Sequence, residues 1–472
     1  MNIRKIAGFA LGPIGSAALG VLTLPLISWF FSSADIGRIA LLQTAASLIL
    51  IALGLGLDQA YIREFHAQKN TASLLKSVLI VPFGLLLLIA LALATQATWF
   101  ANAIFETADG TLGIIALLFC AALVFTRYLS IILRMQERAW AFSFSQLAPK
   151  LWLLLAVAAA TLLPNAQRDT QALTWAYALA QSATVLLLAW QTRSALFAAC
   201  RAPFEPTLLQ QNLRYGMPLA LSGLAYWGLV SADRLLLKQF ANLEAVGVYA
   251  MAANFGALAF IVQSIFSTVW APTLFRWVNE NRDLAPVHHI FRLLLGLVLA
   301  ILCIVGLASP VLTWLLPTQY ADVQYLVLSV ILFPLLYTLS EVSGIGINVS
   351  RQTKLAALIS LAAMLCNVLL CYWLIPVYQA HGAAIATACS FWLFFALKTE
   401  ASIRLWQAFS RPLAYGSTLV AVAVSLAYTH LGSPQNYPYF ALFWLASLGV
   451  LAYLYRLDLL KLKQFVQQKL KN

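Results

Sequence analysis

Long apolar stretches, separated only by short polar connections, fill the 472-residue chain almost from end to end, as residues 293–307 illustrate. The hydrocarbon core of a bilayer is about 30 Å thick, and an α-helix needs about 20 consecutive apolar residues to cross it. Strands that face lipid instead show short segments of alternating polarity. Only 10% of the residues are charged, whereas soluble domains carry about 25%. The sequence therefore predicts an all-α polytopic membrane protein.

The apolar stretches predict about fourteen transmembrane helices and no soluble domain. The longest polar connection, residues 61–77, is too short to fold by itself, so any chemistry must take place at or within the membrane. The predicted spans are residues 10–31, 36–60, 76–98, 112–134, 143–163, 172–196, 212–238, 244–270, 288–314, 323–349, 353–374, 382–404, 412–430 and 439–456.

The basic residues predict the orientation of these helices. Cytoplasmic connections of membrane proteins carry an excess of lysine and arginine. With the N-terminus in the cytoplasm, 23 of the 29 lysines and arginines fall on the cytoplasmic side or at its helix ends, and three, Arg38, Arg168 and Lys238, fall on the other. The remaining three lie within spans. One missed span would invert every later connection, so this asymmetry favours an even helix number with both termini in the cytoplasm.

A weak internal repeat indicates how the helices are organised. Residues 32–48 parallel residues 241–258, with Gly37 matched to Gly247, and each copy follows a helix with an early proline. An offset of about six helices gives both copies the same orientation, as in transporters built from two parallel halves. We therefore expect a six-helix lobe in residues 1–200 and another in 201–408, although two ordinary apolar hairpins would show the same pattern.

Residues 409–472 are expected to add helices 13 and 14 and a basic cytoplasmic tail. In the tail, residues 458–472, apolar side chains alternate with lysines. This pattern suits an amphipathic helix on the anionic inner leaflet, and an ordinary cytoplasmic cap suits it equally well.

Polar residues within spans are costly and mark candidate functional positions. On the fourth and fifth predicted helices, basic and polar residues share one face each and extend inward from the cytoplasmic end. Together they suggest a ramp that attracts a phosphate-bearing headgroup, since arginine binds phosphate in a bidentate manner and lysine acts as a point charge. The alternative for the residues near the interface is snorkelling of long side chains into the headgroups. The two faces comprise Arg127, Ser130, Arg134 and Arg138, and Ser143, Gln146 and Lys150.

Two further predicted helices each carry a polar face, which indicates that these faces line a cavity. The second predicted helix aligns Gln43 with Asp58, and the tenth aligns Glu341 with Asn348. Glu341 would balance a buried cation or carry a coupling proton, and a purely structural ion pair is equally plausible.

Signatures of enzymes, cofactors and metal sites are absent from the sequence. Its five histidines and six cysteines show neither metal-ligand spacing nor a nucleophile motif. A phosphate-cradling glycine loop is also missing, so ATP is not expected to supply the energy directly. The net charge of +13 sorts by membrane side, which argues against a nucleic-acid partner. We therefore expect a protein that is not an enzyme and that needs neither cofactor nor metal.

Three segments carry a family resemblance. GPIGSAALGVLTLPLISWFFSSADIGRIALLQ (residues 12–43), GLGLDQAYIREFH (54–66) and LRYGMPLALSGLAYWGLVSADRLLLKQF (213–240) resemble the Wzx-type flippases of the polysaccharide transporter family. That family lies in the MOP superfamily, with the multidrug and toxin extruders and the lipid II flippase. General similarity in helix count and connection length covers nearly the whole chain.

The resemblance implies two six-helix lobes around a central cavity. It also implies that an undecaprenyl-diphosphate-linked oligosaccharide, such as an O-antigen repeat unit, moves from the cytoplasmic to the periplasmic leaflet of the bacterial inner membrane by alternating access. Membrane lipids, a polysaccharide polymerase and a chain-length regulator are the partners that it suggests. The resembling segments carry over Asp58, Asp233 and Arg234 to the cavity and Arg63 and Glu64 to the cytoplasmic side.

Two other functions remain open. An ion-coupled extruder of organic cations would concentrate acidic groups in its cavity, whereas the buried bases here match or outnumber the acids. A membrane-embedded polymerase or ligase would hold a large outer loop with reactive side chains, and the predicted outer connections are short.

Overall fold

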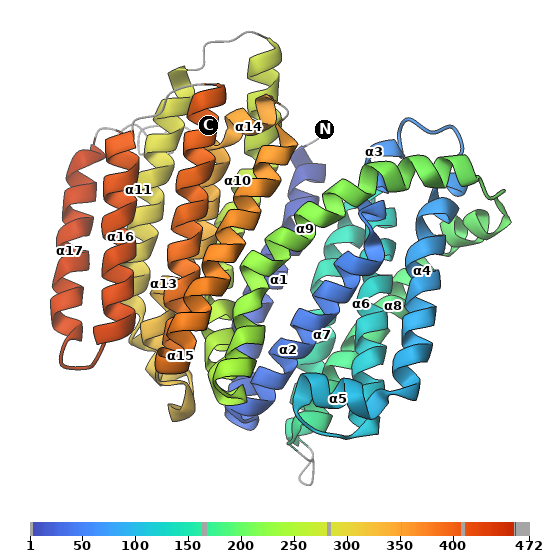
Figure 1. Ribbon diagram of the computed structural model, residues 1–472, viewed down its shortest axis with the longest axis horizontal. Helices are drawn as coiled ribbons and strands as arrows, with labels where there is room; N and C mark the ends of the chain where they lie inside the picture. Colours follow the sequence, from blue (N-terminus) through green and yellow to red (C-terminus); the bar gives the residue numbers. More distant parts are fainter. Residues whose placement is uncertain are drawn as a thin grey trace. The chain divides into compact units, whose positions relative to one another are not determined.

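The computed structural model of the chain describes residues 3–162, 168–280, 285–350, 352–406, 411–456 and 458. Every regular element within these ranges is a helix (Figure 1), so the predicted all-α class is confirmed. The predicted amphipathic tail, apart from Asp458, lies outside the described residues. Eleven of the described helices are long and apolar enough to cross a membrane, and the chain is a multi-pass membrane protein.

By its internal contacts the chain divides into two compact units, residues 1–254 and 255–472. The first contains nine helices and the start of a tenth among its described residues. Their bounds are α1 (Ile3–Phe30), α2 (Ser33–Gly54), α3 (Leu57–Glu64), α4 (Thr71–Thr95), α5 (Ala97–Phe105), α6 (Gly110–Met135), α7 (Ala139–Leu162), α8 (Thr170–Arg201), α9 (Pro206–Phe240) and α10 (Leu243–Asn279).

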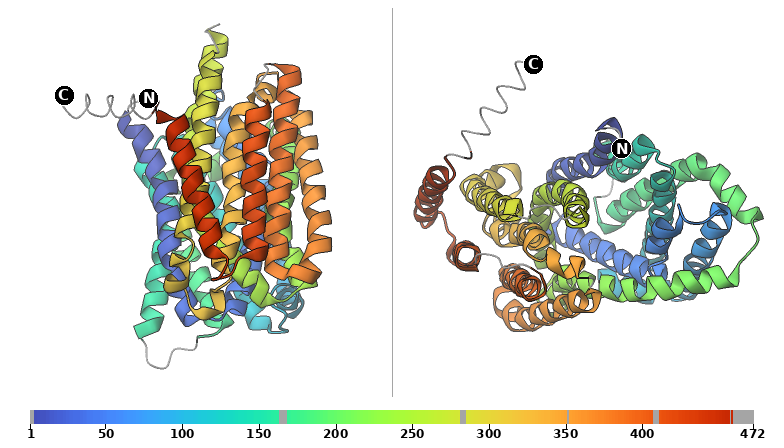
Figure 2. Two further views of the ribbon diagram at one scale, coloured as in Figure 1. Left: turned by 90° about the vertical axis from the view of Figure 1, so that its left-hand side faces the viewer. Right: turned by 90° about the horizontal axis from the view of Figure 1, so that it is seen from above.

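The second unit begins within α10. In it α11, α13, α15, α16 and α17 pack against one another, with α15 alongside both α13 and α16 (Figure 2). Its further elements are α11 (Ala285–Ala308), α12 (Val311–Leu315), the 3-10 helix η1 (Thr318–Tyr320), α13 (Val323–Ser343), α14 (Ile345–Val349), α15 (Thr353–Leu405), α16 (Arg411–Leu431) and α17 (Tyr437–Leu454).

The predicted spans and the observed helices agree closely, because every span overlaps a helix. The number fourteen stays a prediction. α15 holds two of the spans in one element, and α9 and α10, with 35 and 37 residues, are long enough to cross a bilayer but are not among the eleven apolar candidates. The lobe boundary expected at residue 200 also stays a prediction. The observed division lies later, since α9 packs on α2, α3 and α4 of the first unit.

α15 is a helical hairpin rather than one long rod. Gln379 interrupts it with φ 48° and ψ −125°, and the chain reverses there. The Asn367 amide donates to the Thr387 hydroxyl at 3.5 Å, which brings residues twenty positions apart into contact. The connection between the two predicted spans, 353–374 and 382–404, is therefore a sharp turn without a loop.

The small residues of α1 allow it to pack closely on α7. Gly12 donates its backbone N–H to the Ser143 hydroxyl at 3.1 Å. A Cβ atom at Gly15 would lie 2.7 Å from a methyl carbon of Leu147, and one at Gly20 would lie 2.7 Å from Lys150 Nζ. Small residues on α1 thus determine where the side chains of α7 are placed.

The two glycines matched in the repeat meet each other. α2 and α10 cross at their first turns, where a Cβ at Gly37 would lie 2.1 Å from the Leu243 carbonyl oxygen and one at Gly247 would lie 1.9 Å from that of Ser33. Such an approach of two backbones requires glycine on both helices. The two segments matched in the repeat therefore pack directly against each other at this crossing.

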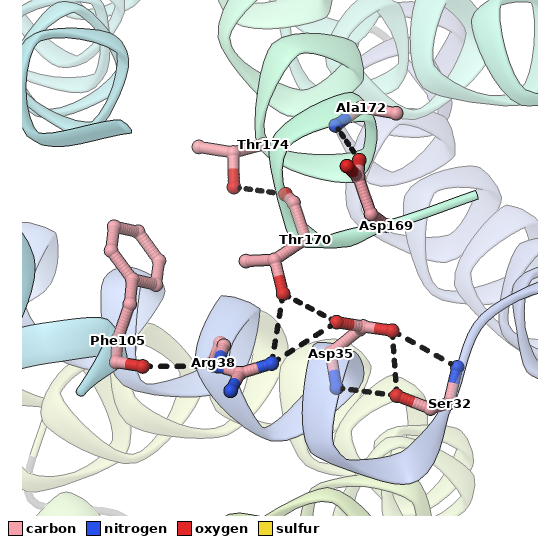
Figure 3. A network of polar contacts seen from close by, with 8 residues as sticks. All are labelled: Ser32, Asp35, Arg38, Phe105, Asp169, Thr170, Ala172 and Thr174. Carbon is pink, nitrogen blue, oxygen red and sulfur yellow. Dashed lines mark hydrogen bonds and ion pairs between the residues drawn. The ribbon is translucent and has the colours of Figure 1, made fainter. Parts of the chain in front are cut away.

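A polar network fixes the start of α2 (Figure 3). Ser32 and Asp35 form a capping box, and the Asp35 carboxylate also accepts a hydrogen bond from the Thr170 hydroxyl of α8. Arg38 donates to Thr170 Oγ1 at 3.0 Å and to the Phe105 carbonyl at the end of α5 at 3.0 Å. One ionic cluster thereby ties α2, α5 and α8 together.

Candidate functional site

Three cavities are lined by residues that the sequence singled out, and each lies within one unit. The α7 cavity surrounds Lys150, the α3 cavity surrounds Asp58 and Arg127, and the α13 cavity surrounds Glu341. Their volumes are about 390, 220 and 100 Å³, respectively. Since charge inside a span is costly unless it faces a polar space, these cavities are the natural places for function.

The α7 cavity surrounds the side-chain ammonium group of Lys150. Lys150 Nζ donates to the Ser16 carbonyl oxygen of α1 at 2.7 Å, and no aspartate or glutamate is among the described residues lining the cavity. Its walls carry hydroxyl and amide groups between apolar surfaces. The lining residues are Gly20, Thr23, Leu24, Ile27, Gln43, Phe119, Leu123, Pro149, Lys150, Leu153, Tyr177, Ala180, Gln181 and Asn254.

Glycine at position 20 creates the space for this ammonium group. The Lys150 side chain crosses from α7 to α1 at the point where Gly20 lacks a Cβ. The predicted cavity residue Gln43 reaches the same space from α2, and Gln181 reaches it from α8, where its amide donates to Thr126 Oγ1 at 2.8 Å. One lysine and two glutamine side chains therefore share a single space inside the first unit.

The α3 cavity contains an ion pair. Arg127 Nη2 of α6 lies 2.7 Å from Asp58 Oδ2 of α3, and the Gln59 amide donates to the same oxygen at 2.9 Å. The guanidinium side chain is 43% exposed and the carboxylate side chain 18%. α2 and α9 complete the wall, mainly with apolar side chains.

A helix break brings Asp58 to Arg127. The predicted span 36–60 is in fact two helices, because Leu55 and Gly56 both adopt left-handed backbone conformations between α2 and α3. A Cβ at Gly56 would lie 2.2 Å from the Gly216 carbonyl of α9. The break therefore presses α3 against α9 and places Asp58 in the first turn of a new helix, where a carboxylate is favoured by the helix dipole.

The α13 cavity brings together groups of opposite charge in the second unit. Glu341 Oε2 accepts a hydrogen bond from the Ser267 hydroxyl at 2.5 Å, and the Glu341 carbonyl accepts one from Trp270 Nε1 at 3.2 Å. Asn348, which the sequence placed on the same face, lines the cavity from α14. Lys398 of α15 lines it from the other side.

The sequence did not indicate Lys398 as a cavity residue, because it lies toward the cytoplasmic end of the predicted span 382–404 and is one of the 23 basic residues assigned to that side. Its Nζ lies 5.2 Å from the centre of the Tyr337 ring and 5.3 Å from that of Phe394. Gly344, at the break between α13 and α14, leaves room for its stem, since a Cβ there would lie 2.5 Å from Lys398 Cγ. Lys398 lies seven residues before the end of α15, and a long basic side chain so near a helix end usually belongs to the interface.

Other predicted residues lie outside the three cavities. Asp233 is 1% exposed and accepts a hydrogen bond from the Tyr249 hydroxyl of α10, which ties α9 to α10. Arg234 is half-buried, and its backbone N–H donates to Asp233 Oδ1 at 2.8 Å. Neither of them is among the residues lining the cavities described above.

The residues expected at the cytoplasmic side are mostly surface groups. Arg63 lies over the Tyr215 ring at 4.3 Å, and its Nε is 3.3 Å from Glu64. Arg134 and Arg138 are exposed, and Arg138 donates to the Gln191 carbonyl at 2.8 Å. These contacts agree with side chains that extend along the protein surface.

The structure does not bring Arg127 and Lys150 together in one ramp. α7 packs on α1, so Lys150 points toward Ser16, whereas Arg127 lies on the side of α6 that meets α2 and α3. Adjacent helices can share a cytoplasmic end while their polar faces point to different neighbours. The two cations occupy separate cavities of the same unit.

Comparison with known proteins supports the architecture. The family model described as polysaccharide biosynthesis protein matches residues 3–278. No curated protein matches the sequence. Among solved structures, the lipid II flippase MurJ in an inward closed conformation is similar over 96% of this chain and 99% of that one, with a TM-score of 0.68 and 14% identity.

Multidrug transporters share the same fold. A MATE family transporter of the MOP superfamily in an inward-facing conformation covers 82% of this chain and 94% of its own, with a TM-score of 0.63 and 15% identity. A MATE structure in the straight conformation gives a TM-score of 0.59 at 16% identity, over 85% of this chain and 95% of its own. The predicted relationship is confirmed: the chain belongs to the polysaccharide biosynthesis protein family and has the fold of the MOP superfamily.

Proposed function

We propose that the protein is a flippase that moves undecaprenyl-diphosphate-linked oligosaccharide repeat units from the cytoplasmic to the periplasmic leaflet of a bacterial inner membrane. Both termini would then lie in the cytoplasm, and transport would proceed by alternating access. A polysaccharide polymerase and a chain-length regulator are the expected downstream partners. The family match and the flippase fold support this class of cargo.

The observation that carries the proposal is Lys150 in the α7 cavity. A cation held inside a span beside a backbone carbonyl, with no carboxylate among the described lining residues, leaves its charge available to an anion. A sugar diphosphate cannot cross hydrocarbon unaided, because each exposed polar group costs several kcal/mol there. A polar chamber with a fixed cation offsets that cost for the diphosphate as it passes through the protein, while most of the prenyl chain stays in lipid.

The test is a flipping assay in proteoliposomes. A disaccharide linked through diphosphate to a short prenyl chain, with a fluorophore on the sugar, is placed in both leaflets, and a membrane-impermeant reductant quenches the accessible fraction. With the wild-type protein, the quenched fraction of the fluorescence should rise well above one half, because glycolipid from the inner leaflet becomes accessible. Lys150→Ala should reduce the rate at least about tenfold, since a charge-assisted contact contributes 1.5–3 kcal/mol.

Glu400→Gln is the matched control. It removes a carboxylate that lies 2.9 Å from Arg411 in an exposed ion pair away from all three cavities, so it should flip at the wild-type rate. Quenching equal to that of protein-free vesicles would refute the proposed function.

An organic-cation extruder is the second candidate. The Glu341 carboxylate, in a cavity that also holds aromatic Trp270 and Tyr337, is the observation that favours it. Binding of a fluorescent organic cation that Glu341→Gln abolishes, together with no flipping of the glycolipid, would support the extruder instead.

A further inference from the structure

The α3 cavity has a charged end and an apolar remainder, which is the arrangement of groups in a prenyl diphosphate. Its charged end consists of Arg127 and Asp58, joined by Gln59, and no other described lining residue is charged. Its remaining walls are mainly apolar, with Leu50 and Ile51 of α2 and Leu219, Ala220 and Gly223 of α9, and they are completed by Gly54, Gly56 and Tyr128. A diphosphate joined to an isoprenoid chain likewise has a compact anionic group directly attached to an apolar tail.

Arg127 is accessible to such a ligand even in its paired state. Its side chain is 43% exposed, and an arginine inside a span is tolerated only where it faces a polar space. Asp58 contacts it through one oxygen, at Nη2. A guanidinium group binds two oxygens side by side, and a diphosphate offers several with more negative charge than a carboxylate. The ligand therefore competes with Asp58 on favourable terms.

Asp58 is stabilised well enough to release the arginine. The Gln59 amide donates to the same carboxylate oxygen at 2.9 Å. The residue also occupies the first turn of α3, where the helix dipole stabilises a negative charge. When a ligand takes Arg127, the carboxylate retains these two sources of stabilisation.

We propose that the α3 cavity binds the diphosphate–prenyl junction of the lipid-linked substrate, and that the diphosphate displaces Asp58 from Arg127. Asp58 is then an internal competitor that takes the arginine back when the substrate leaves, which keeps binding reversible. The inference rests on the proposed function, and it distinguishes the two cations. Arg127 has a carboxylate to exchange, whereas the described lining of the Lys150 cavity contains none.

The test measures binding directly, by isothermal titration calorimetry of the full chain in lipid nanodiscs. The two probes are inorganic pyrophosphate and geranyl diphosphate, at one ionic strength and without divalent metal. Asp58→Asn should bind pyrophosphate about threefold to fivefold more tightly than the wild type, because it removes the competitor. Arg127→Gln should bind it about tenfold more weakly, and the double variant should match Arg127→Gln, because no cation is left to release. Glu400→Gln should bind like the wild type.

Gly223→Leu tests the apolar wall. A Cβ at Gly223 would lie 3.9 Å from Ile51 Cγ2, so alanine fits there and the rest of a leucine side chain enters the cavity. This variant should bind pyrophosphate normally and lose the additional affinity for geranyl diphosphate.

Several results would overturn the inference. Asp58→Asn with unchanged or weaker pyrophosphate affinity removes the competitor role, and tighter binding in the double variant than in Arg127→Gln does the same. Equal geranyl diphosphate affinity in Gly223→Leu and the wild type removes the prenyl assignment. If proteoliposomes that contain the wild-type protein still flip the glycolipid in these cases, the proposed function is retained and only the assignment of the α3 cavity is lost. If the wild type neither binds pyrophosphate nor flips, both proposals fail.

Discussion

The contact between α1 and α7 allows the role of Lys150 to be tested without changing its charge. Gly20→Ala would place a methyl group 2.7 Å from Lys150 Nζ. Ordinary van der Waals contact begins at about 3.4 Å, so the ammonium group must move by roughly 0.7 Å or more. Gly15→Ala is a matched control on the same helix, because its methyl group would lie 2.7 Å from a terminal methyl carbon of Leu147. In both variants the new methyl group contacts the flexible end of a side chain. Only the Lys150 side chain is charged.

The expected effect follows from the bond that is disturbed. Lys150 donates to the Ser16 carbonyl at 2.7 Å, and a hydrogen bond to a charged group contributes about 1.5–3 kcal/mol. An ammonium group displaced in this way loses a contact of this size with the diphosphate, and losing the lower value reduces a rate or affinity roughly tenfold. Its bond to the Ser16 carbonyl can re-form after a small rotation, so stability should fall by only about 1 kcal/mol in either variant.

The assay is the flipping measurement described above, with thermal unfolding monitored in parallel. Gly20→Ala should flip the glycolipid roughly tenfold more slowly than Gly15→Ala, while both unfold at similar temperatures. Equal flipping rates in the two variants would show that the position of the ammonium group does not matter for transport.

Two predictions concern stability alone. Gly247→Val would bring a branched side chain against the Ser33 carbonyl, which is backbone and cannot rotate away, so it should lower the free energy of unfolding by about 3 kcal/mol; an unchanged midpoint in denaturant titration would contradict the crossing. Ser402→Ala would remove the hydroxyl that accepts the Gly346 N–H at 3.0 Å, which leaves a buried donor unpaired. This change should cost about 1–3 kcal/mol, measured as a lower thermal midpoint than that of Ser417→Ala, whose half-buried hydroxyl donates only to the Leu413 carbonyl of its own helix at 2.6 Å.

The helices could be predicted because the bilayer imposes one strong requirement on sequence. Length and apolarity predicted spans that all overlap observed helices, whereas breaks in the backbone within a span were not predicted. The break before Asp58 arises at Leu55, a residue with no intrinsic preference for a left-handed conformation, and the contact between Gly56 and Gly216 that accompanies it is tertiary. Hydropathy and helical periodicity detect a break only where the apolar character of the sequence changes, and it does not change here.

The cavities were predictable only residue by residue. Helical periodicity identified Arg127, Lys150 and Glu341 as costly polar residues, and the structure places each in a cavity. Periodicity does not show which neighbouring helix each face contacts. It therefore placed Arg127 and Lys150 in one ramp, although they line separate cavities. Lys398 was hidden because a charge near a helix end usually belongs to the interface, and only the break at Gly344 brings it beside Glu341.

The single-residue reversal at Gln379 has a consequence for biogenesis. Two helical arms joined without a spacer are held side by side by their covalent connection, so they can pair without waiting for the rest of the chain. Their pairing links residues close in sequence, such as Asn367 and Thr387, which makes closure entropically cheap and early. The arm that carries Lys398 would therefore pair with its neighbour before the rest of the second unit closes around them.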